Sequence, residues 1–286
     1  MPELPEVQTI VDDLHKVLKK KRILSIRVTK PRLLHNPLTF LRQHLVGATI
    51  RSVRRRAKLL LFDLSSGYTL IIHLKMTGQL IWRSHLGKLS GGGHPIVGVA
   101  SVPNRYTHIT IDLSGGSRLY FNDVRQFGYF KLLPTSALVQ HFSSYGPEPL
   151  SVDFSLSGLR AELQRRRRST IKAALLNQQV VAGIGNIYAD ESLFVAGLSP
   201  SRRVGRLTQV QAAKLYRAIR QVLKRAVHSR GTSFSNYVDG LGRTGTYWPR
   251  RLVYGRAGSP CRRCGRTIKR TVVAGRGTNF CPHCQK

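Results

Sequence analysis

The pattern of hydrophobic and polar positions changes character near the middle of the chain. Apolar residues recur at helical spacing over residues 7–18, which predicts an amphipathic helix near the amino terminus. Beyond it come short runs rich in β-branched and aromatic residues, several of them alternating as in THITIDL, separated by Ser-Gly and Gly-Gly turns. This pattern predicts a β-sandwich with strands near 23–29, 48–55, 59–64, 69–74, 79–82, 107–113, 118–122 and 128–133.

The second half of the chain has a helical period, which follows the proline-rich stretch GPEPL (146–150). Two of its helices flank the turn QQVVAGIGN, where Gly183 and Gly185 let backbone amides approach a neighbour closely and Asn186 suits the start of a helix. Amides at a helix N-terminus bind phosphate, although an ordinary helical hairpin explains the same residues. The chain is therefore predicted to be α+β, with helices near 156–166, 169–179, 186–196 and 208–228.

A glycine-rich stretch, HLGKLSGGGHPIVGVASVPN, lies between Ser84 and Asn104. We interpret residues 84–104 as a mobile loop, because glycine and proline punctuate the stretch throughout. Three consecutive glycines alone are weak evidence for a phosphate-binding loop. The sequence therefore assigns no ligand to this segment.

Charge indicates the class of partner. The chain has 47 Lys and Arg against 13 Asp and Glu, a net charge of +34 and a pI near 11.4. After Glu191 the only acidic residue is Asp239, against twenty Lys and Arg. A free globule of this charge repels itself, and we expect nucleic acid as the polyanionic partner. Because no run of about 18 apolar residues and no signal peptide is present, we expect a soluble, intracellular protein with no membrane partner.

The four cysteines form two pairs with the spacing of metal ligands. They lie in CRRC and CPHC, which are sixteen residues apart, and two such knuckles bring four thiolates to the corners of one tetrahedral Zn²⁺. Two disulfides are the alternative, but two-residue spacing strains a bridge, and a cytosolic chain keeps its thiols reduced. Four thiolates close a structural site, which leaves His283 outside it. We predict one structural zinc ion bound by Cys261, Cys264, Cys281 and Cys284.

The first seven residues, MPELPEV, place two scarce carboxylates beside the amino terminus. Pro5 suits the first turn of a helix, and Glu6 suits the positive end of the helix dipole. A helix start does not explain Pro2 or Glu3. These two residues are therefore candidates for a functional role.

Taken together, the motifs resemble the formamidopyrimidine-DNA glycosylases and their endonuclease VIII relatives, which repair oxidised bases. The resemblance covers nearly the whole chain and rests on PELPEV, RRRAKLLLFDL, HLKMTGQL, FNDVRQFG, YGPEPL, VVAGIGNIYADESLF, VYGR and the terminal cysteine pairs. It implies an N-terminal β-sandwich domain with an N-terminal helix (1–134), a linker (135–152), a helical helix-two-turn-helix domain (153–250) and a zinc-finger β-hairpin (251–286). It also implies double-stranded DNA held between the domains, a monomer, and a place in the bacterial cytoplasm on the nucleoid.

The resemblance implies that Pro2, Glu3, Lys58 and Arg276 act in the reaction. Removal of Met1 frees Pro2 as a secondary amine, and its attack on the sugar C1′ gives an iminium that has no N–H to lose. This permanent cation favours loss of the base and then acidifies the C2′ hydrogen for strand cleavage by β/δ-elimination. Glu3 is placed to protonate the sugar ring oxygen, and Lys58 approaches the lesion and its phosphate.

Further positions match DNA contacts of the family. One set of family positions contacts the phosphate backbone, where side chains neutralise charge rather than read sequence. The residues that match this set are Asn186, Lys172, Arg167 and Arg276. A flipped nucleotide leaves a gap in the stack, which apolar wedges and an arginine fill. The residues that match this second set are Met76, Arg125 and Phe127.

The sequence departs from the family pattern in three places. Lys75 stands where HLGMTG has glycine, and Gln126 replaces the second arginine of RRFG. Tyr106, in NRYTH, occupies a position where a DNA-contacting histidine is usual. A tyrosine hydroxyl still donates a hydrogen bond to phosphate, so we retain Tyr106 as a DNA contact.

The expected function is that of a bifunctional DNA glycosylase and AP lyase for oxidised purines such as 8-oxoguanine and formamidopyrimidines. PELPEV and the stretch RGTSFSNYVDGLGRTGTYW (230–248) favour purine lesions over the oxidised pyrimidines of an endonuclease VIII-like enzyme. A catalytically silent DNA-binding relative is the second alternative. Intact Pro2, Glu3 and Lys58 favour an enzyme over that alternative.

Overall fold

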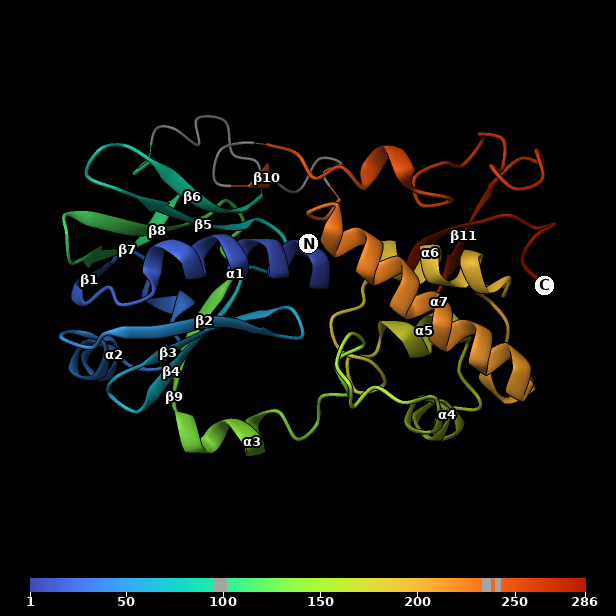
Figure 1. Cartoon of the computed structure of the whole chain (residues 1–286), viewed down its shortest axis with the longest axis horizontal. Helices are drawn as coiled ribbons and strands as arrows, with labels where there is room; N and C mark the ends of the chain where they lie inside the picture. The colour runs from blue at the N-terminus through green and yellow to red at the C-terminus, as the bar shows by residue number, and fades with distance from the viewer. Residues whose placement is uncertain (95–101, 233–237, 240–242) are drawn as a thin grey trace. The chain divides into compact units, whose positions relative to one another are not determined.

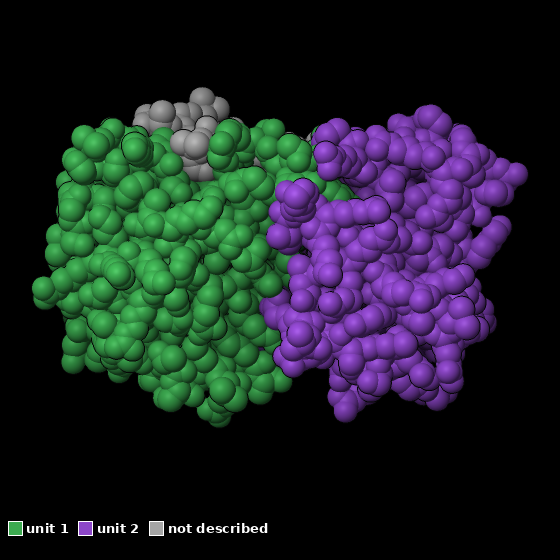
Figure 2. Space-filling view, in the orientation of Figure 1, with its two compact units in different colours: residues 1–143, 229–248 green, residues 144–228, 249–286 purple. Residues whose placement is uncertain are grey.

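The chain folds into two compact units (Figure 2). The computed structural model describes residues 1–94, 102–232, 238–239 and 243–286 (Figure 1). Unit 1 comprises Met1–Ser143 and Ser229–Trp248, and unit 2 comprises Ser144–His228 and Pro249–Lys286. The contacts thus group Ser229–Trp248 with the N-terminal half, whereas the expected boundaries placed this segment in the helical domain. The expected division into domains stays a prediction.

Unit 1 is a sandwich of two antiparallel sheets, as the sequence predicted. The sheets have the strand orders β1-β7-β8-β5-β6-β10 and β2-β3-β4-β9. The strands of the first sheet are β1 (Ile23–Val28), β5 (Gly78–Arg83), β6 (Leu89–Gly93), β7 (Thr107–Leu113), β8 (Ser117–Asp123) and β10 (Val238–Asp239). Those of the second are β2 (Ile50–Arg56), β3 (Leu59–Leu64), β4 (Tyr68–His73) and β9 (Tyr129–Pro134).

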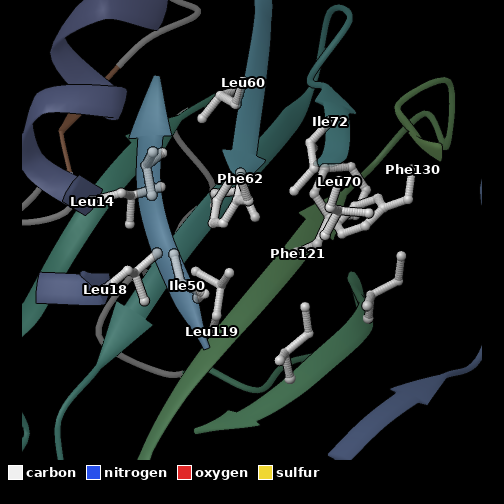
Figure 3. Close-up of a cluster of buried hydrophobic side chains, with 14 of the residues drawn as sticks. Leu14, Leu18, Ile50, Leu60, Phe62, Leu70, Ile72, Leu119, Phe121 and Phe130 are labelled. Atoms are coloured by element: carbon white, nitrogen blue, oxygen red, sulfur yellow. The ribbon is translucent and has the colours of Figure 1, made fainter. Parts of the chain in front are cut away.

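Helix α1 (Leu4–Leu18) buries its apolar face in the core of the sandwich (Figure 3). Leu14 and Leu18 are fully buried in one cluster with Phe62, and the rings of Phe121 and Phe130 meet edge to face at 5.1 Å. Burial of one such side chain contributes about 1.5–3 kcal/mol. The helix and its N-terminal end are therefore fixed on the sheets.

Short helices complete the connections of unit 1, and the sequence analysis did not predict them. They are α2 (Leu38–Leu45), α3 (Leu138–His141), and the 3₁₀ turns η1 (Pro31–Leu33) and η2 (Thr135–Ala137). Among the residues that the structure describes, no helix is long and apolar enough to cross a membrane.

The triglycine segment is a strand, so the interpretation of 84–104 as a loop is wrong for Leu89–Gly93. Strand β6 pairs with β5 on one side and with β10 on the other. Gly92 has φ +147°, and a Cβ there would lie 2.6 Å from the carbonyl oxygen of Val238. Glycine therefore lets β10 approach the sheet edge. Residues 95–101 of the same segment lie outside the described part of the chain.

Unit 2 is helical with a C-terminal β-hairpin. Its helices are α4 (Leu156–Gln164), α5 (Ile171–Leu176), α6 (Asn186–Ala196) and α7 (Gln209–His228), with 3₁₀ turns η3 (Val204–Arg206) and η4 (Trp248–Arg250), the latter at the boundary of the units. Its hairpin consists of β11 (Lys269–Val273) and β12 (Arg276–Phe280). Side-chain caps begin two helices, since Ser155 Oγ accepts from Gly158 N and Thr170 Oγ1 accepts from Ala173 N.

Candidate functional site

The N-terminal end of α1 gathers buried polar groups. Pro2, Glu3 and Glu6 are all buried, and Glu6 Oε2 accepts a hydrogen bond of 2.8 Å from the backbone N–H of Glu3. This i, i+3 contact is one half of a capping box, which fixes the entry of the chain into the helix. The residues PELPE therefore build a rigid helix start with carboxylates directly at the chain terminus.

Glu6 also holds a second segment of unit 1. Its Oε1 atom accepts a hydrogen bond of 2.7 Å from the backbone N–H of Thr232. Gly231 lies against this carboxylate with φ +82°, and a Cβ there would be 2.8 Å from Glu6 Oε1. The glycine of the sequence RGTSF is thus required by this close approach. The adjoining residues 233–237, part of the stretch that favoured purine lesions, lie outside the described residues.

The environment favours a neutral amine at the chain terminus. Burial lowers the pKa of the Met1 amino group below its ordinary value, the nearby charges of Glu3 and Glu6 raise it, and Lys58 lowers it further. Lys58 is itself buried in the turn between β2 and β3, next to Ala57 at φ +54°. An amine with a lowered pKa is a better nucleophile at neutral pH.

His73, at the end of β4, is a residue near this site that the sequence analysis missed. Burial, together with the positive charges of Lys75 and Lys58, lowers the pKa of His73 to about 3. The neutral ring fits its contact, because Nδ1 accepts a hydrogen bond of 2.9 Å from the backbone N–H of Lys75. The signal in the sequence is the histidine of HLKMTGQL, which lies two residues before Lys75 and three before Met76.

Met76, Arg125 and Phe127 come together from two separate loops. Arg125 Nη1 lies 3.1 Å from the sulfur of Met76, and its guanidinium lies 4.8 Å from the centre of the Phe127 ring. Met76 is 44 % exposed and Phe127 54 % exposed. The three residues form an exposed cluster in which both apolar side chains contact the Arg125 guanidinium.

A buried carboxylate, Asp123, shapes the loop that carries Arg125. It accepts hydrogen bonds from the Thr77 hydroxyl and, at 2.7 Å, from the backbone N–H of Gly128. Its own backbone N–H donates to the carbonyl oxygen of Tyr106 at 3.0 Å. Asp123 therefore joins three loops, and the sequence analysis did not identify it within FNDVRQFG.

Two of the three departures from the family pattern fall on special backbone positions. Lys75 has φ +49° and Gln126 has φ +55°, both in the left-handed region. An L-residue other than glycine strains there by about 1–2 kcal/mol. Lys75 places its ammonium 5.5 Å from the Tyr129 ring centre, and Gln126 accepts a hydrogen bond from Arg32. Tyr106 packs its ring against the guanidinium of Arg105 at 4.7 Å.

In unit 2, Arg167, Asn186 and Arg276 occupy different kinds of position. Arg167 is exposed in the run that follows α4. Asn186 is the first residue of α6, and its Nδ2 donates a hydrogen bond of 3.0 Å to the carbonyl oxygen of Gly277. Arg276 is exposed and begins β12 directly after the turn at Ala274 and Gly275.

The environment of Lys172 differs from that expected of a residue that contacts the DNA backbone. Its side chain is fully buried, and Nζ lies 2.6 Å from Asp190 Oδ1 and 2.8 Å from Thr278 Oγ1. A buried ammonium bonded to these acceptors is not available to a phosphate at the surface. The correction is that Lys172 contacts the hairpin of its own unit.

Glu191 is a second residue in unit 2 that the sequence analysis missed. Its carboxylate accepts hydrogen bonds of 2.8–2.9 Å from the backbone N–H groups of Leu252, Val253 and Tyr254. These residues lie in the motif VYGR and directly before it, and Val253 packs in one buried cluster with Cys261 and Cys281. Glu191 therefore fixes the entry of the chain into the cysteine-rich module.

The four cysteines meet at one point, as predicted. Their Sγ atoms all lie within 4.8 Å of one another, with 3.9 Å between those of Cys261 and Cys284 and 3.5 Å between those of Cys264 and Cys281. A tetrahedral centre with Zn–S bonds of about 2.3 Å separates its sulfur atoms by about 3.8 Å. The cysteines are unbridged thiols, and their donor set fits one structural zinc ion.

Three family models match successive parts of the chain. Residues 1–130 match the formamidopyrimidine-DNA glycosylase N-terminal domain, and residues 145–237 match the formamidopyrimidine-DNA glycosylase H2TH domain. Residues 258–286 match the zinc finger found in FPG and IleRS. The matches follow the order of sandwich, helices and cysteine-rich hairpin.

Whole-chain relatives agree with these matches. Formamidopyrimidine-DNA glycosylases from Pelotomaculum thermopropionicum and Chloroflexus aggregans are 42% and 43% identical, over 100% of this chain and 99% and 98% of theirs. Among solved structures, a mutant of the Lactococcus lactis FPG in complex with a Fapy-dG-containing DNA has a TM-score of 0.89. It is 34% identical, with 100% of both chains covered.

Proposed function

Because the chain belongs to the formamidopyrimidine-DNA glycosylase family, we propose that it excises oxidised purines from duplex DNA and cleaves the resulting abasic site. The observation that carries this proposal is the buried helix start, where Pro2 and Glu3 lie buried side by side and the Glu6 carboxylate fixes the backbone of Glu3. A nucleophilic amine beside an acid is what glycosylase and lyase chemistry requires.

In the proposed reaction, Pro2 becomes the terminal residue when Met1 is removed. Its nitrogen attacks C1′, the bond between C1′ and the base breaks, and the base leaves with the electron pair and takes up the proton that the Pro2 nitrogen loses. Glu3 supplies a proton to the ring oxygen as the sugar opens, which leaves a cationic iminium on Pro2. Loss of the C2′ proton then expels the 3′ phosphate by elimination.

Glu6 has a supporting role in this proposal. Both of its oxygen atoms accept backbone hydrogen bonds, one from Glu3 and one from Thr232. A carboxylate held in this way is a poor proton donor but a good structural anchor. Glu6 therefore positions Glu3, and Glu3 is the general acid.

The DNA contacts follow from charge and position in the family motifs. We assign phosphate contacts to Lys58, Arg167, Asn186 and Arg276, and a contact through its hydroxyl to Tyr106. The exposed cluster of Met76, Arg125 and Phe127 offers apolar surface and a cation to the gap that a flipped nucleotide leaves. The enzyme is proposed to act as a monomer.

The zinc ion has a structural role in this scheme. Cys261, Cys264, Cys281 and Cys284 would hold it, and four thiolates leave no position for a reactive water. When bound, the ion supplies a rigid link between two knuckles. The hairpin that carries Arg276 is thereby held in the folded state.

Covalent trapping tests the proposal. Borohydride reduces the iminium, so incubation with an 8-oxoguanine duplex should link protein and DNA through Pro2. A variant with extra residues before Pro2 carries the Pro2 nitrogen as a non-nucleophilic tertiary amide and should give no adduct at Pro2 while still binding the duplex. Undiminished trapping by the extended protein would place the nucleophile elsewhere, with Lys58 the first residue to examine.

Two other functions would give different results. A silent DNA-binding relative would form no adduct even when Met1 is correctly removed. An endonuclease VIII-like enzyme would release oxidised pyrimidines faster than 8-oxoguanine from matched duplexes. The relative whose complex contains Fapy-dG, a ring-opened purine, favours the purine assignment.

A further inference from the structure

The two ends of strand β12 in the hairpin of unit 2 are held in place by different contacts. At one end, Cys281 follows β12 and belongs to the cysteine cluster. At the other end, Arg276 begins β12 after a two-residue turn and is exposed. The strand between them spans five residues, so a metal bound at Cys281 does not by itself set the direction of Arg276.

A buried ammonium holds the Arg276 end. Lys172 Nζ donates to Thr278 Oγ1 at 2.8 Å and lies 3.2 Å from the carbonyl oxygen of Gly277. Thr278 Oγ1 in turn donates to the carbonyl oxygen of Arg276 at 2.9 Å. A chain of hydrogen bonds thus runs from Lys172 in α5 to the backbone of Arg276.

A buried carboxylate in α6 completes this attachment. Asp190 Oδ1 lies 2.6 Å from Lys172 Nζ, and Asp190 Oδ2 accepts a hydrogen bond of 2.8 Å from the backbone N–H of Asn279. Asn186, one turn earlier on the same helix, donates to Gly277. Three consecutive hairpin residues are therefore bonded to α5 and α6.

We propose that Lys172 and Asp190 are positioning residues that direct Arg276 toward the DNA backbone, at the opposite end of the hairpin from the zinc ion. This inference rests on the proposed function, in which Arg276 contacts phosphate. The pair touches no substrate itself. It acts through Thr278 and Asn279, which fix the strand that Arg276 begins.

The nature of the pair supports a positioning role over a stabilising one. Both side chains are fully buried, and the desolvation of two charges offsets much of their attraction. Apolar residues of similar volume often stabilise such a site as well or better, but they provide no directed hydrogen bonds. Directed bonds to Thr278 and Asn279 are what an ion pair adds here.

The test compares Asp190→Asn with Asp153→Asn, an exposed carboxylate of the same unit. Binding is measured with a duplex that carries a stable abasic-site analogue, over a range of salt concentrations, beside zinc content and thermal unfolding. We expect Asp190→Asn to keep its zinc and to bind about tenfold more weakly. The slope of log K against log salt should fall by about 1, as for loss of one phosphate contact. Asp153→Asn should match the unaltered protein.

A double-mutant cycle with Arg276→Ala separates positioning from general damage. If the pair acts through Arg276, Asp190→Asn should cause no further loss of affinity in the Arg276→Ala background. Additive losses would overturn the inference.

A second variant covers the case in which Asp190→Asn folds poorly. Lys172→Met combined with Asp190→Leu removes both charges and should fold at least as stably, yet bind DNA as weakly as Arg276→Ala. Full affinity in this folded, zinc-loaded double variant would overturn the inference. If Arg276→Ala still loses affinity in that case, the phosphate contact of the proposed function stands while the positioning role of the pair falls.

Discussion

The start of α1 in unit 1 and the Arg276 end of the hairpin in unit 2 use buried carboxylates in different ways. Glu6, in the first turn of α1, accepts hydrogen bonds from the backbone N–H of Glu3, three residues earlier, and from the backbone N–H of Thr232, 226 residues later. Asp190 accepts from Asn279, which is 89 residues away in sequence, and pairs with Lys172. In the proposed function, the first carboxylate organises the reactive terminus, and the second positions a residue that binds DNA. Chemistry and binding are therefore expected to be separable by mutation.

Loss of a zinc ligand should have the largest effect on binding. Cys264→Ala removes one of four thiolates from a module whose buried cluster is formed by the cysteines themselves with Phe194, Val253 and Ile268. We expect loss of zinc, unfolding of the hairpin and abolished binding of lesion duplex, because structural zinc provides folding energy. His283→Ala, an exposed residue of the same module, should keep both zinc and affinity. Unchanged affinity in Cys264→Ala would contradict this role of the module.

Loss of the proposed acid should break chemistry and leave binding intact. Glu3→Gln keeps the shape of the buried side chain and the terminal amine but cannot supply a proton. Release of 8-oxoguanine should fall by about 10²-fold, while the duplex Kd changes little. Asp12→Asn, an exposed change on the same helix, serves as the control. Release at the full rate by Glu3→Gln would assign the proton to another group.

The sequence predicts those parts of the fold that a local pattern of residues determines. Helix α6 was predicted with its observed bounds, 186–196, because glycines and an asparagine mark its start. Strands with alternating residues, such as β7 (Thr107–Leu113), were also found, because burial on one face leaves a period of two. Strand β6 was missed, since the glycines of LSGGG have no side chains to alternate.

The site was predictable where its contacts are local or carry motif residues. Pro2, Glu3 and the cysteines were identified from short motifs, and the cysteines do come together in the structure. Asp123 was missed because Thr77, one of its partners, is 46 residues away and neither residue has a distinctive spacing. Lys172 was assigned to DNA through its match to a family motif, and the burial of a side chain cannot be read from such a match.

Truncation of an exposed aromatic residue should have a smaller effect that is specific to unstacking. Phe127→Ala removes one of the two apolar side chains beside Arg125. Because Phe127 lies at the surface, its truncation should change the free energy of unfolding by less than about 0.5 kcal/mol. Release of 8-oxoguanine should fall about tenfold, because the few kcal/mol needed to flip the nucleotide are less well offset. Cleavage of a preformed abasic site should fall less. Val139→Ala, at another exposed apolar residue of unit 1, controls for surface truncation.

The smallest expected effect concerns pH, and its measurement tests whether burial and the nearby lysine charges keep His73 neutral in the folded protein. Burial and the charges of Lys75 and Lys58 lower its folded pKa to about 3, below the ordinary histidine value near 6.5. A group with a depressed folded pKa contributes stability above its unfolded pKa, and this contribution is lost as pH falls toward the folded pKa. Between pH 6.5 and 4 the unaltered protein should therefore lose stability more steeply than His73→Gln, by up to about 1.4 kcal/mol per pH unit.

Urea unfolding of both proteins at pH 7, 5.5 and 4 measures this difference directly. Subtracting the two stability curves removes every titration that the proteins share, so the remaining slope belongs to His73. His15→Gln provides a matched control, because His15 lies in the same unit and bonds to the backbone of Val53. Parallel curves for the unaltered protein and His73→Gln would show that His73 takes up its proton equally well in the folded and unfolded chain. A protonated His73 has no acceptor nitrogen. In that case the hydrogen bond from the backbone N–H of Lys75 to His73 Nδ1 would have to break without a cost in stability.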